Sequence, residues 1–320
     1  MQTKTVTMLL AGALACGLAA VPVAGNAQDK PSRITMLSGS PGGSWYPISA
    51  GIAEALGGAG IDTRVEQGGG GSNILNISAG RAEAGFGLTT LNYVAKQGGG
   101  VFKKPVEGVM GLTVLFKQIA HTVVTKESGV TSYDQLKGKR MASQPVSNGS
   151  TAIFRDTLTA YGLNGEEDLN IVVRGSPSAG ANAVKDRQAI GFILTTSPPT
   201  SAVLEVAQAL DIRLLPISDN AFANLSKANP GYSRGVIPGG TYEGIPEDVV
   251  SVGDDTILMT HPGVSEDTAY WIVRGFAEQL PQIHKVHPAL SKLSVKDMAG
   301  VQVLDLHPGA VKYYKEAGAM

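Results

Sequence analysis

Short apolar runs alternate with amphipathic segments along the chain from Arg33 onward. Runs rich in Ile, Val, Leu and Thr predict β-strands, whereas apolar residues spaced three or four apart predict α-helices. The predicted strands are 34–37, 63–66, 84–89, 109–115, 121–125, 140–143, 171–173, 190–194, 213–217 and a late strand containing TILMTH.

The predicted helices fall between these strands. Ser44 is expected to cap the first helix, and Ser72 to precede a short helix that ends at Gly80. Ser197 is expected to cap a later helix with Pro198 at its first position, where proline is tolerated. The remaining helices are predicted within SYDQLKGK and SNGSTAIFRDTLTAYGL and over 265–279 and 309–317.

This alternation of strands and helices is typical of an α/β fold with mostly parallel sheets. Loops of one type recur in both halves of the chain, which favours two lobes with a cleft between them over one continuous sheet. The chain is expected to cross between lobes near Leu115–Ala120 and to return near Ile217–Asn220. Lobe 1 would then comprise 28–116 and 220–320, and lobe 2 would comprise 117–219.

Four loops share one design, in which a strand is followed by Gly or Ser and then by the first turn of a helix. They are the segments 39–46, 68–73, 147–151 and 195–200. Ligands of α/β proteins lie outside the carboxyl ends of the strands, where such loops gather. Helix N-termini carry unpaired N–H groups and a partial positive charge, so several of them facing one cleft would bind a carboxylate without a formal cation.

The loops supply most of the candidate ligand-binding residues. Each loop taken alone is equally explained as a simple helix cap, so the prediction depends on all four meeting at one cleft. Arg174 is the one cation predicted at a strand end, and it faces either the cleft or solvent. The candidates are Gly43, Ser44, Trp45, Tyr46, Gly71, Ser72, Asn73, Gly149, Ser150, Thr151, Arg174 and Ser197.

The first residues have a different character from the rest of the chain. An apolar run from Met8 to Val23 follows Lys4, and small residues precede Gln28, so we expect a signal peptide over 1–27 that is cleaved near Ala27 for export to the periplasm. A transmembrane helix is disfavoured because glycine and proline interrupt the run. A lipoprotein site at Cys16, the only cysteine, fits poorly, so the mature chain is expected to contain neither a disulfide nor a thiol nucleophile.

Composition and motifs exclude several functions. A formal net charge of −1 over 320 residues gives no reason to expect nucleic acid or a membrane surface as a partner. The first Gly-rich loop lacks the spacing of a dinucleotide fingerprint, and neither a Walker motif nor a Gly-x-Ser-x-Gly elbow is present. Four of the five histidines fit turns (His261 and His307) or a helix surface (His284 and His287), and His121 begins a predicted strand, so no catalytic residue, metal ligand or cofactor is predicted.

Five stretches of the sequence resemble a known family. They are SGSPGGSWYPISAGIAEAL, GGGGSNILNISAGRAEAGFG, YDQLKGKRMASQPVSNGST, GGTYEGIPEDVVSVGDDTILM and LHPGAVKYYKEAG. The chain is similar in these stretches to the TAXI group, the extracytoplasmic solute receptors associated with TRAP transporters. The resemblance implies a two-lobed periplasmic binding protein fold of the second topological type, with a cleft for a small carboxylate-bearing solute such as a glutamate-like amino acid or a dicarboxylate.

The resemblance also matches particular positions. The family's first Gly-rich run corresponds to Gly42–Tyr46, its Gly-Ser-Gly-Thr run to Asn148–Thr151, and its loop asparagine to Asn73. Trp45 replaces a smaller aromatic residue, and the serine of the second loop is next to Asn73 rather than a few residues earlier. These departures affect the expected solute more than the expected fold.

The expected function is therefore capture of a solute without chemistry, by a monomer that delivers it to a TRAP membrane permease. Two alternatives remain open at this point. One is a binding protein that serves a sensor kinase, and the other is an enzyme on the same fold, because a fold does not determine a function.

Overall fold

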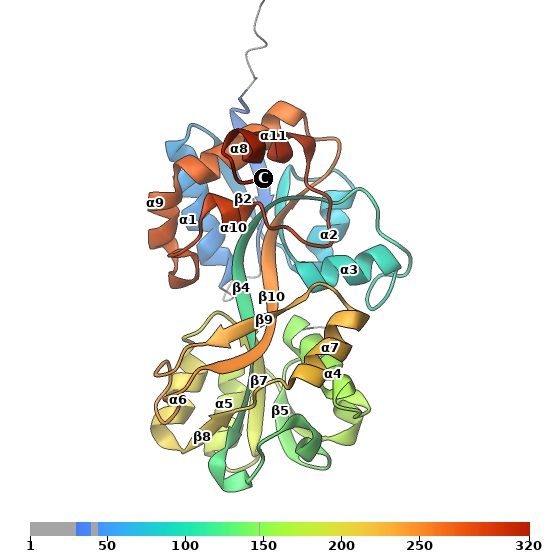
Figure 1. The fold of residues 1–320 in the computed structure, drawn as a ribbon, viewed down its shortest axis with the longest axis vertical. Helices are drawn as coiled ribbons and strands as arrows, with labels where there is room; N and C mark the ends of the chain where they lie inside the picture. Colours follow the sequence, from blue (N-terminus) through green and yellow to red (C-terminus); the bar gives the residue numbers. More distant parts are fainter. Residues whose placement is uncertain (1–29, 40–43, 147) are drawn as a thin grey trace, which may run out of the picture.

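The computed structural model describes residues 30–39, 44–146 and 148–320. It has two lobes stacked along the longest axis, each with strands flanked by helices (Figure 1). Two long antiparallel strands, β4 (Met110–Thr125) and β10 (Val249–Thr260), run through both lobes. The α/β class and the two-lobed shape therefore agree with the prediction from the sequence.

Hydrogen bonding is nevertheless continuous from one lobe to the other. The strands form one sheet in the order β2-β1-β3-β10-β4-β7-β5-β6, with β8 on β4 and β9 on β10. Neighbours within β2-β1-β3 and within β7-β5-β6 are parallel. The other strands are β1 (Arg33–Leu37), β2 (Asp62–Glu66), β3 (Ala84–Leu88), β5 (Arg140–Ser143), β6 (Asn170–Arg174), β7 (Gly191–Thr196), β8 (Ile212–Leu214) and β9 (Tyr232–Ile237).

The first crossing between lobes differs from the prediction in its structure. Two separate strands with a crossing at Leu115–Ala120 were expected, but β4 is a single strand there. The polar residues Lys117 and Gln118, which interrupt the apolar pattern, lie opposite Asp255 and Asp254 of β10. Because these partners continue the ladder, the polar positions do not end the strand.

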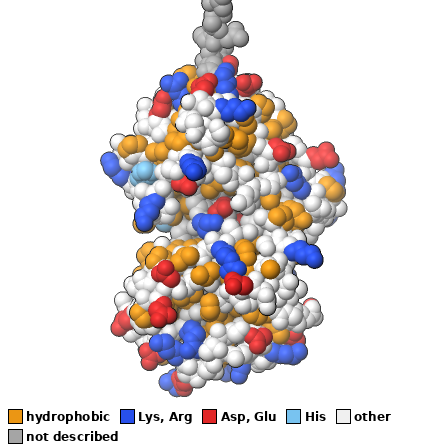
Figure 2. All heavy atoms as spheres, in the orientation of Figure 1, with side chains coloured by type: hydrophobic (Ala, Val, Ile, Leu, Met, Phe, Trp, Pro, Cys, Tyr) orange, Lys and Arg blue, Asp and Glu red, His pale blue; other side chains and the backbone are white. Residues whose placement is uncertain are grey.

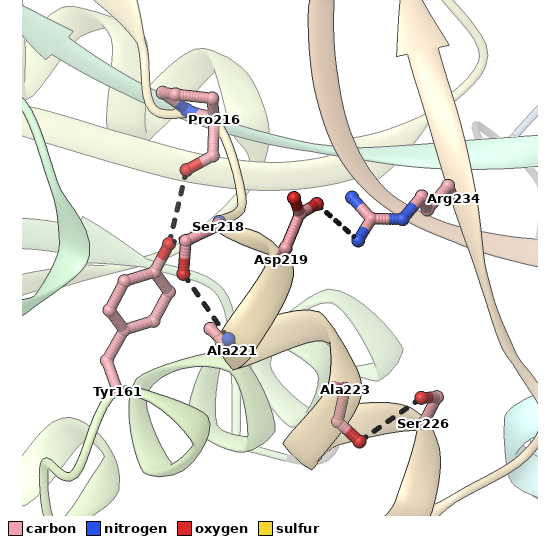
Figure 3. Close-up of polar contacts among 8 residues, drawn as sticks. All are labelled: Tyr161, Pro216, Ser218, Asp219, Ala221, Ala223, Ser226 and Arg234. Carbon is pink, nitrogen blue, oxygen red and sulfur yellow. Dashed lines mark hydrogen bonds and ion pairs between the residues drawn. The ribbon is translucent and has the colours of Figure 1, made fainter.

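The return to the first lobe also lies elsewhere. Instead of returning at Ile217–Asn220, the chain continues into α7 (Asp219–Ala228), which packs on α4 (Gly149–Ala160) of the second lobe. Figure 3 shows the attachment: the hydroxyl of Tyr161 donates to the carbonyl of Pro216 at 3.4 Å, and Asp219 pairs with Arg234 of β9 at 2.8 Å. The same hydroxyl accepts from the backbone N–H of Ser218 at 2.7 Å. The chain therefore returns only through β10.

Two further expectations about helix starts are wrong. Gly69, not Ser72, is the N-cap of α2 (Gly70–Ser78), so Ser72 lies in the first turn. Thr200, not Ser197, precedes α6 (Ser201–Ala209). Ser197 and Pro198 each precede a proline, and a residue in that position is driven away from the helical conformation, so the helix begins later.

Each lobe has its own apolar core. In lobe 1, Ile34, Ile52, Ile272 and Phe276 are fully buried between the sheet and its covering helices. In lobe 2, the core includes Val123, Phe192 and Val203. The other helices are α1 (Trp45–Gly58), α3 (Thr89–Gln97), α4 (Gly149–Ala160), α5 (Pro177–Lys185), α8 (Glu266–Glu278), α9 (Leu280–Val286), α10 (Val295–Met298) and α11 (Pro308–Glu316).

The exterior carries charges of both signs. Figure 2 shows acidic and basic side chains interspersed over both lobes on the face in view. Within the described part of the chain, none of the helices combines the length and the apolarity that a membrane crossing requires. The predicted signal peptide and Cys16 lie outside the described residues.

Candidate binding cleft

A cavity of about 610 Å³ lies between the two lobes. Lobe 1 contributes Gly39, which follows β1, and Leu88 at the end of β3. Lobe 2 contributes Gln144, which follows β5, and Thr196 at the end of β7. The cavity therefore lies at the carboxyl ends of parallel strands from both lobes, which is the usual position of ligands in α/β proteins.

Helix starts from both lobes surround this cavity. The lining contains the N-cap residues of α1, α2, α3, α4 and α6 and the first residue of α5. Each helix N-terminus carries a partial positive charge and N–H groups that lack an intrahelical partner. Together these starts favour an anion at the centre of the cavity. The residues concerned are Ser44, Gly69, Leu88, Asn148, Pro177 and Thr200.

The start of α3 differs from the others because the chain supplies its own acid there. The buried carboxyl group of Asp254 accepts hydrogen bonds from the backbone N–H of Thr90 at 3.2 Å and from its hydroxyl at 2.5 Å. Burial raises the pKa of Asp254 to about 7. The donors at this helix start are therefore already used by an acid of the chain. The first turns of α1, α2, α4, α5 and α6 contain no acidic residue, and α4 and α5 are capped by the neutral side chains of Asn148 and Ser176.

The start of α4 shows how the chain prepares a donor. The side-chain oxygen of Asn148 accepts from the backbone N–H of Ser150 at 2.8 Å and caps the helix. The hydroxyl of Ser150, which is only 8% exposed, accepts from the backbone N–H of Thr195 at 3.0 Å. Since its oxygen is the acceptor in that bond, its hydrogen is left to be donated to a ligand oxygen.

Gln118 connects the two lobes at the middle of β4. With its amide oxygen towards lobe 1, it accepts from the indole N–H of Trp45 at 3.0 Å and from the hydroxyl of Thr256 at 3.0 Å. Its amide nitrogen donates to the carbonyl of Thr195 in lobe 2 at 3.1 Å. Gln118, a residue of the crossing strand, thus holds the side chain of Trp45 on one wall of the cleft and the backbone of Thr195 on the other.

Apolar side chains complete the lining. Trp45 and Leu88 come from lobe 1, and Ile153 and Leu194 come from lobe 2. Trp45 packs edge-on against Phe86, with ring centroids 5.7 Å apart, which holds its indole in place. The cavity therefore offers an apolar surface on both walls in addition to its polar helix starts.

The described lining contains no acidic, basic or histidine side chain. The neighbouring residues outside the described part of the chain are Ser, Pro, Gly and Gly at 40–43 and Ser at 147, none of them ionisable. Formal charge consequently enters the cavity only with a ligand.

The predicted site residues divide into those that line the cavity and those that do not. Parts of all four predicted loops reach it, and Ser44, Trp45, Gly149 and Ser150 are among the lining residues. Gly43 lies outside the described residues. Of the remaining described candidates, Tyr46, Gly71, Ser72, Asn73, Thr151, Arg174 and Ser197 are not part of the lining.

Several of these remaining candidates support the loops instead. The fully buried Asn73 donates to the carbonyls of Ser38 and Phe86, both at 2.8 Å, and accepts from the N–H of Gly69 at 3.0 Å. The hydroxyl of Thr151 donates to the carbonyl of Gln144 at 3.1 Å.

Two more of the polar candidates, Arg174 and Ser197, form contacts within the chain. Arg174 forms an ion pair of 3.0 Å with Glu166, whose side chain is only 6% exposed. Ser197 donates to the carbonyl of Lys117 at 3.2 Å.

The sequence analysis missed Gln118, Gln144 and Thr196. Gln144 and Thr196 follow or end predicted strands, so their position was a usable signal. Gln118 had no such signal because it lies within a strand.

No catalytic arrangement of side chains is found among the described residues of this cleft. His121 is buried, with contacts to the carbonyl of Ile119 at 2.8 Å and the hydroxyl of Tyr242 at 3.0 Å, and burial lowers its pKa to about 4. His307 caps α11. Among the described residues, no group of three or more potential ligands is arranged to hold a metal ion.

Comparison with known proteins agrees with this architecture. The sequence model of the NMT1-like family matches residues 36–318. A TctC solute binding protein from Polaromonas superposes with a TM-score of 0.58 at 12% identity, over 91% of this chain and 96% of that chain. A Xanthomonas citri protein with bound chloride gives 0.50 at 13% identity, over 90% and 97%. The fold is that of the two-lobed α/β periplasmic binding proteins.

Proposed function

Because the chain belongs to the NMT1-like family, we propose that it is an extracytoplasmic receptor that captures a small carboxylate-bearing solute between its lobes. The observation that carries this proposal is the set of five helix starts, none with an acidic residue in its first turn, around a cavity whose described lining has no charged side chain. Such a cavity attracts an anion by hydrogen bonds and helix dipoles and repels none by acidic side chains.

Capture requires the solute to touch both lobes. Ser44 and Trp45 would hold it from lobe 1, and Gly149, Ser150 and Thr196 from lobe 2. A ligand shifts an equilibrium between open and closed forms only by its differential affinity for them. A solute that bridges the two walls has that property, so it favours the closed form.

We propose that the closed receptor docks on a membrane permease and releases the solute for ion-coupled uptake. The resemblance to TAXI receptors supports a TRAP-type permease, a monomeric receptor and export to the periplasm after removal of residues 1–27. The anion-attracting cleft is equally suited to a receptor that serves a sensor kinase. A gene for a large fused membrane subunit next to this one, and loss of solute uptake on its deletion, would support transport.

Calorimetric titration of the mature protein tests the binding function. We expect saturable binding of at least one small carboxylate from a set of monocarboxylates, C4–C5 dicarboxylates and acidic amino acids. The corresponding amides are the matched control and should bind at least tenfold more weakly, because a hydrogen bond to a charged group is about twice as strong as one to a neutral group. If no carboxylate binds to the folded protein, the proposed function is wrong.

A further inference from the structure

We propose, resting on the function proposed above, that the solute is a monoanion with an apolar body rather than a dicarboxylate or an α-amino acid. The inference rests on three features of the cavity between the lobes: the acceptors in its lining, the absence of a basic side chain from its described lining, and its apolar surface. Each of these three features limits what the part of the solute beyond its carboxylate can be.

Three hydrogen-bond acceptors of the lining already receive hydrogen bonds from the chain, and none of the acceptors in the described lining is a carboxylate. The side-chain oxygen of Gln118 accepts from Trp45 and Thr256, and the carbonyl of Thr195 accepts from Gln118. The side-chain oxygen of Asn148 accepts from the N–H of Ser150. An ammonium group has three donors and no acceptor, so it would be desolvated here without an anionic partner.

A second carboxylate would lack a cation. The lysine and arginine side chains within three residues of a lining residue are Lys117, Arg155 and Arg174. Lys117 pairs with Asp255 at 3.1 Å, and Arg174 pairs with Glu166 at 3.0 Å. None of the three belongs to the described lining. Two carboxylates on one small solute would also compete for the same group of helix starts, where like charges repel each other.

The part of the solute beyond its carboxylate would pack against the apolar part of the lining. Trp45 and Leu88 on one wall face the cavity together with Ile153 and Leu194 from the other. Burying a methylene group against such a surface is favourable, whereas burying a charge there is not. The body of the solute is therefore aliphatic or otherwise uncharged.

A matched six-carbon series separates these properties. Calorimetric titration would compare hexanoate with adipate, which adds a second carboxylate, with norleucine, which adds an ammonium group, and with hexanamide, which removes the charge. We expect hexanoate to bind at least tenfold more tightly than each of the other three. The same four classes would be measured from three to eight carbons, so that chain length does not decide the result.

The outcomes distinguish the inference from the proposed function. If a dicarboxylate or an amino acid binds as tightly as the matched monoanion at the best chain length, the inference is wrong and the carboxylate receptor stands. If the amides bind as tightly as the monoanions, or if no carboxylate binds, both proposals are wrong.

A gain-of-charge variant tests the same point from the protein's side. Thr196 ends β7 at the cavity and is half-buried. Thr196→Lys adds the missing cation and should raise the affinity ratio of adipate to hexanoate at least tenfold, whereas the neutral control Thr196→Gln should leave it unchanged. Thr196→Arg repeats the test if the lysine variant does not fold. An unchanged ratio in a folded charged variant would contradict the inference.

Discussion

The lining of the cleft and the residues behind it differ in their charged side chains. Behind the cleft, Glu166 is paired with Arg174, and Asp255 with Lys117. In the described lining of the cleft, charged side chains are absent and helix starts take their place. The charged side chains behind the cleft are therefore paired with each other. The described lining presents only the partial positive charges of the helix starts, which a bound anion can neutralise.

Two helix starts make the difference concrete. At α3, the buried carboxyl group of Asp254 accepts from the backbone N–H and the hydroxyl of Thr90, so these donors are already used by the chain. At α4, the cap is the neutral Asn148, which satisfies the N–H of Ser150 without adding charge. A neutral cap keeps the helix stable while leaving its partial charge to the solute, and an acidic cap does not.

The largest effect is expected from Arg174→Gln. The buried Glu166 would lose its cation, and one of its carboxylate oxygens already has no hydrogen-bond partner among the described residues. Breaking a buried ion pair costs about 3–5 kcal/mol, and because Arg174 is partly exposed we expect a loss of about 2–3 kcal/mol in the free energy of unfolding in urea. Solute affinity should change less than about twofold, which is within roughly 0.4 kcal/mol.

Lys137→Gln is the control for this prediction. Lys137 pairs with Asp168 at 3.2 Å, and its side chain is 69% exposed. Surface pairs contribute about 0–1 kcal/mol, so this variant should unfold almost as the wild type does. A variant of Arg174 with normal stability and weakened solute binding would instead place its guanidinium group in the site.

The next largest effect is expected at Asp254. Asp254→Ala removes the acceptor of the buried Thr90 N–H and leaves a small cavity, so we expect a loss of about 2 kcal/mol in the free energy of unfolding. Asp254→Asn keeps the shape of the side chain and an oxygen for the Thr90 N–H. It should therefore be much closer to the wild type in urea unfolding at neutral pH.

The asparagine variant also tests the pKa of this carboxyl group. Burial raises the pKa of Asp254 from 3.8 to about 7, so the folded state holds a proton that the unfolded state has released between these values. The contribution of Asp254 to stability is therefore complete below about pH 4 and is lost as the pH rises to about 7. Melting curves of Asp254→Asn should lack this decline, and an identical pH dependence in both proteins would contradict the assignment.

Most of the fold could be predicted because its signals are local. Strand runs such as Ile34–Leu37 and the start of α1 after Ser44 have neighbours in sequence that determine them, although the side chain of Ser44 makes no capping hydrogen bond. The single strand β4 and the attachment of α7 could not be predicted in this way. In the sequence, Lys117 and Gln118 interrupt the apolar pattern and indicate that the strand ends there. Their partners in β10, Asp255 and Asp254, are more than a hundred residues away.

The cleft was only half predictable for a related reason. Ser150 and Thr151 are adjacent polar residues in the same helix start, and the sequence gives them equal standing as ligand-binding residues. Their side chains point to different places: Ser150 lines the cavity, and Thr151 donates to the carbonyl of Gln144. Side-chain direction within one helical turn depends on the packing around it, which a loop pattern does not contain.

This pair of residues provides the third prediction. Ser150→Ala should weaken solute binding about tenfold, or about 1.4 kcal/mol, because a donor to the bound carboxylate is lost. Thr151→Val is the matched control, since it removes the neighbouring hydroxyl with little change of shape. Calorimetry should give Thr151→Val an affinity within about twofold of the wild type, or roughly 0.4 kcal/mol. Equal losses in both variants would mean that the helix start is merely distorted.

The smallest effect is expected from Trp45→Phe, which tests the link between the cleft and the crossing strand. Phenylalanine keeps most of the apolar surface and removes the indole N–H that donates to Gln118. Gln118 still accepts from Thr256 in that variant, so its oxygen is not left unsatisfied. We therefore expect solute affinity to fall only about two- to threefold, or about 0.4–0.7 kcal/mol.

Fluorescence makes the same substitution a sharper test. The chain has two tryptophans, and Trp45 lies at the cavity while Trp271 packs against the core of lobe 1. A solute-dependent change in emission should disappear in Trp45→Phe, while the emission of Trp271 persists. If the change persists, the solute is not beside Trp45. If affinity falls tenfold or more, the indole N–H contacts the solute directly. The anion would then be held by the indole N–H in addition to the donors of the helix starts.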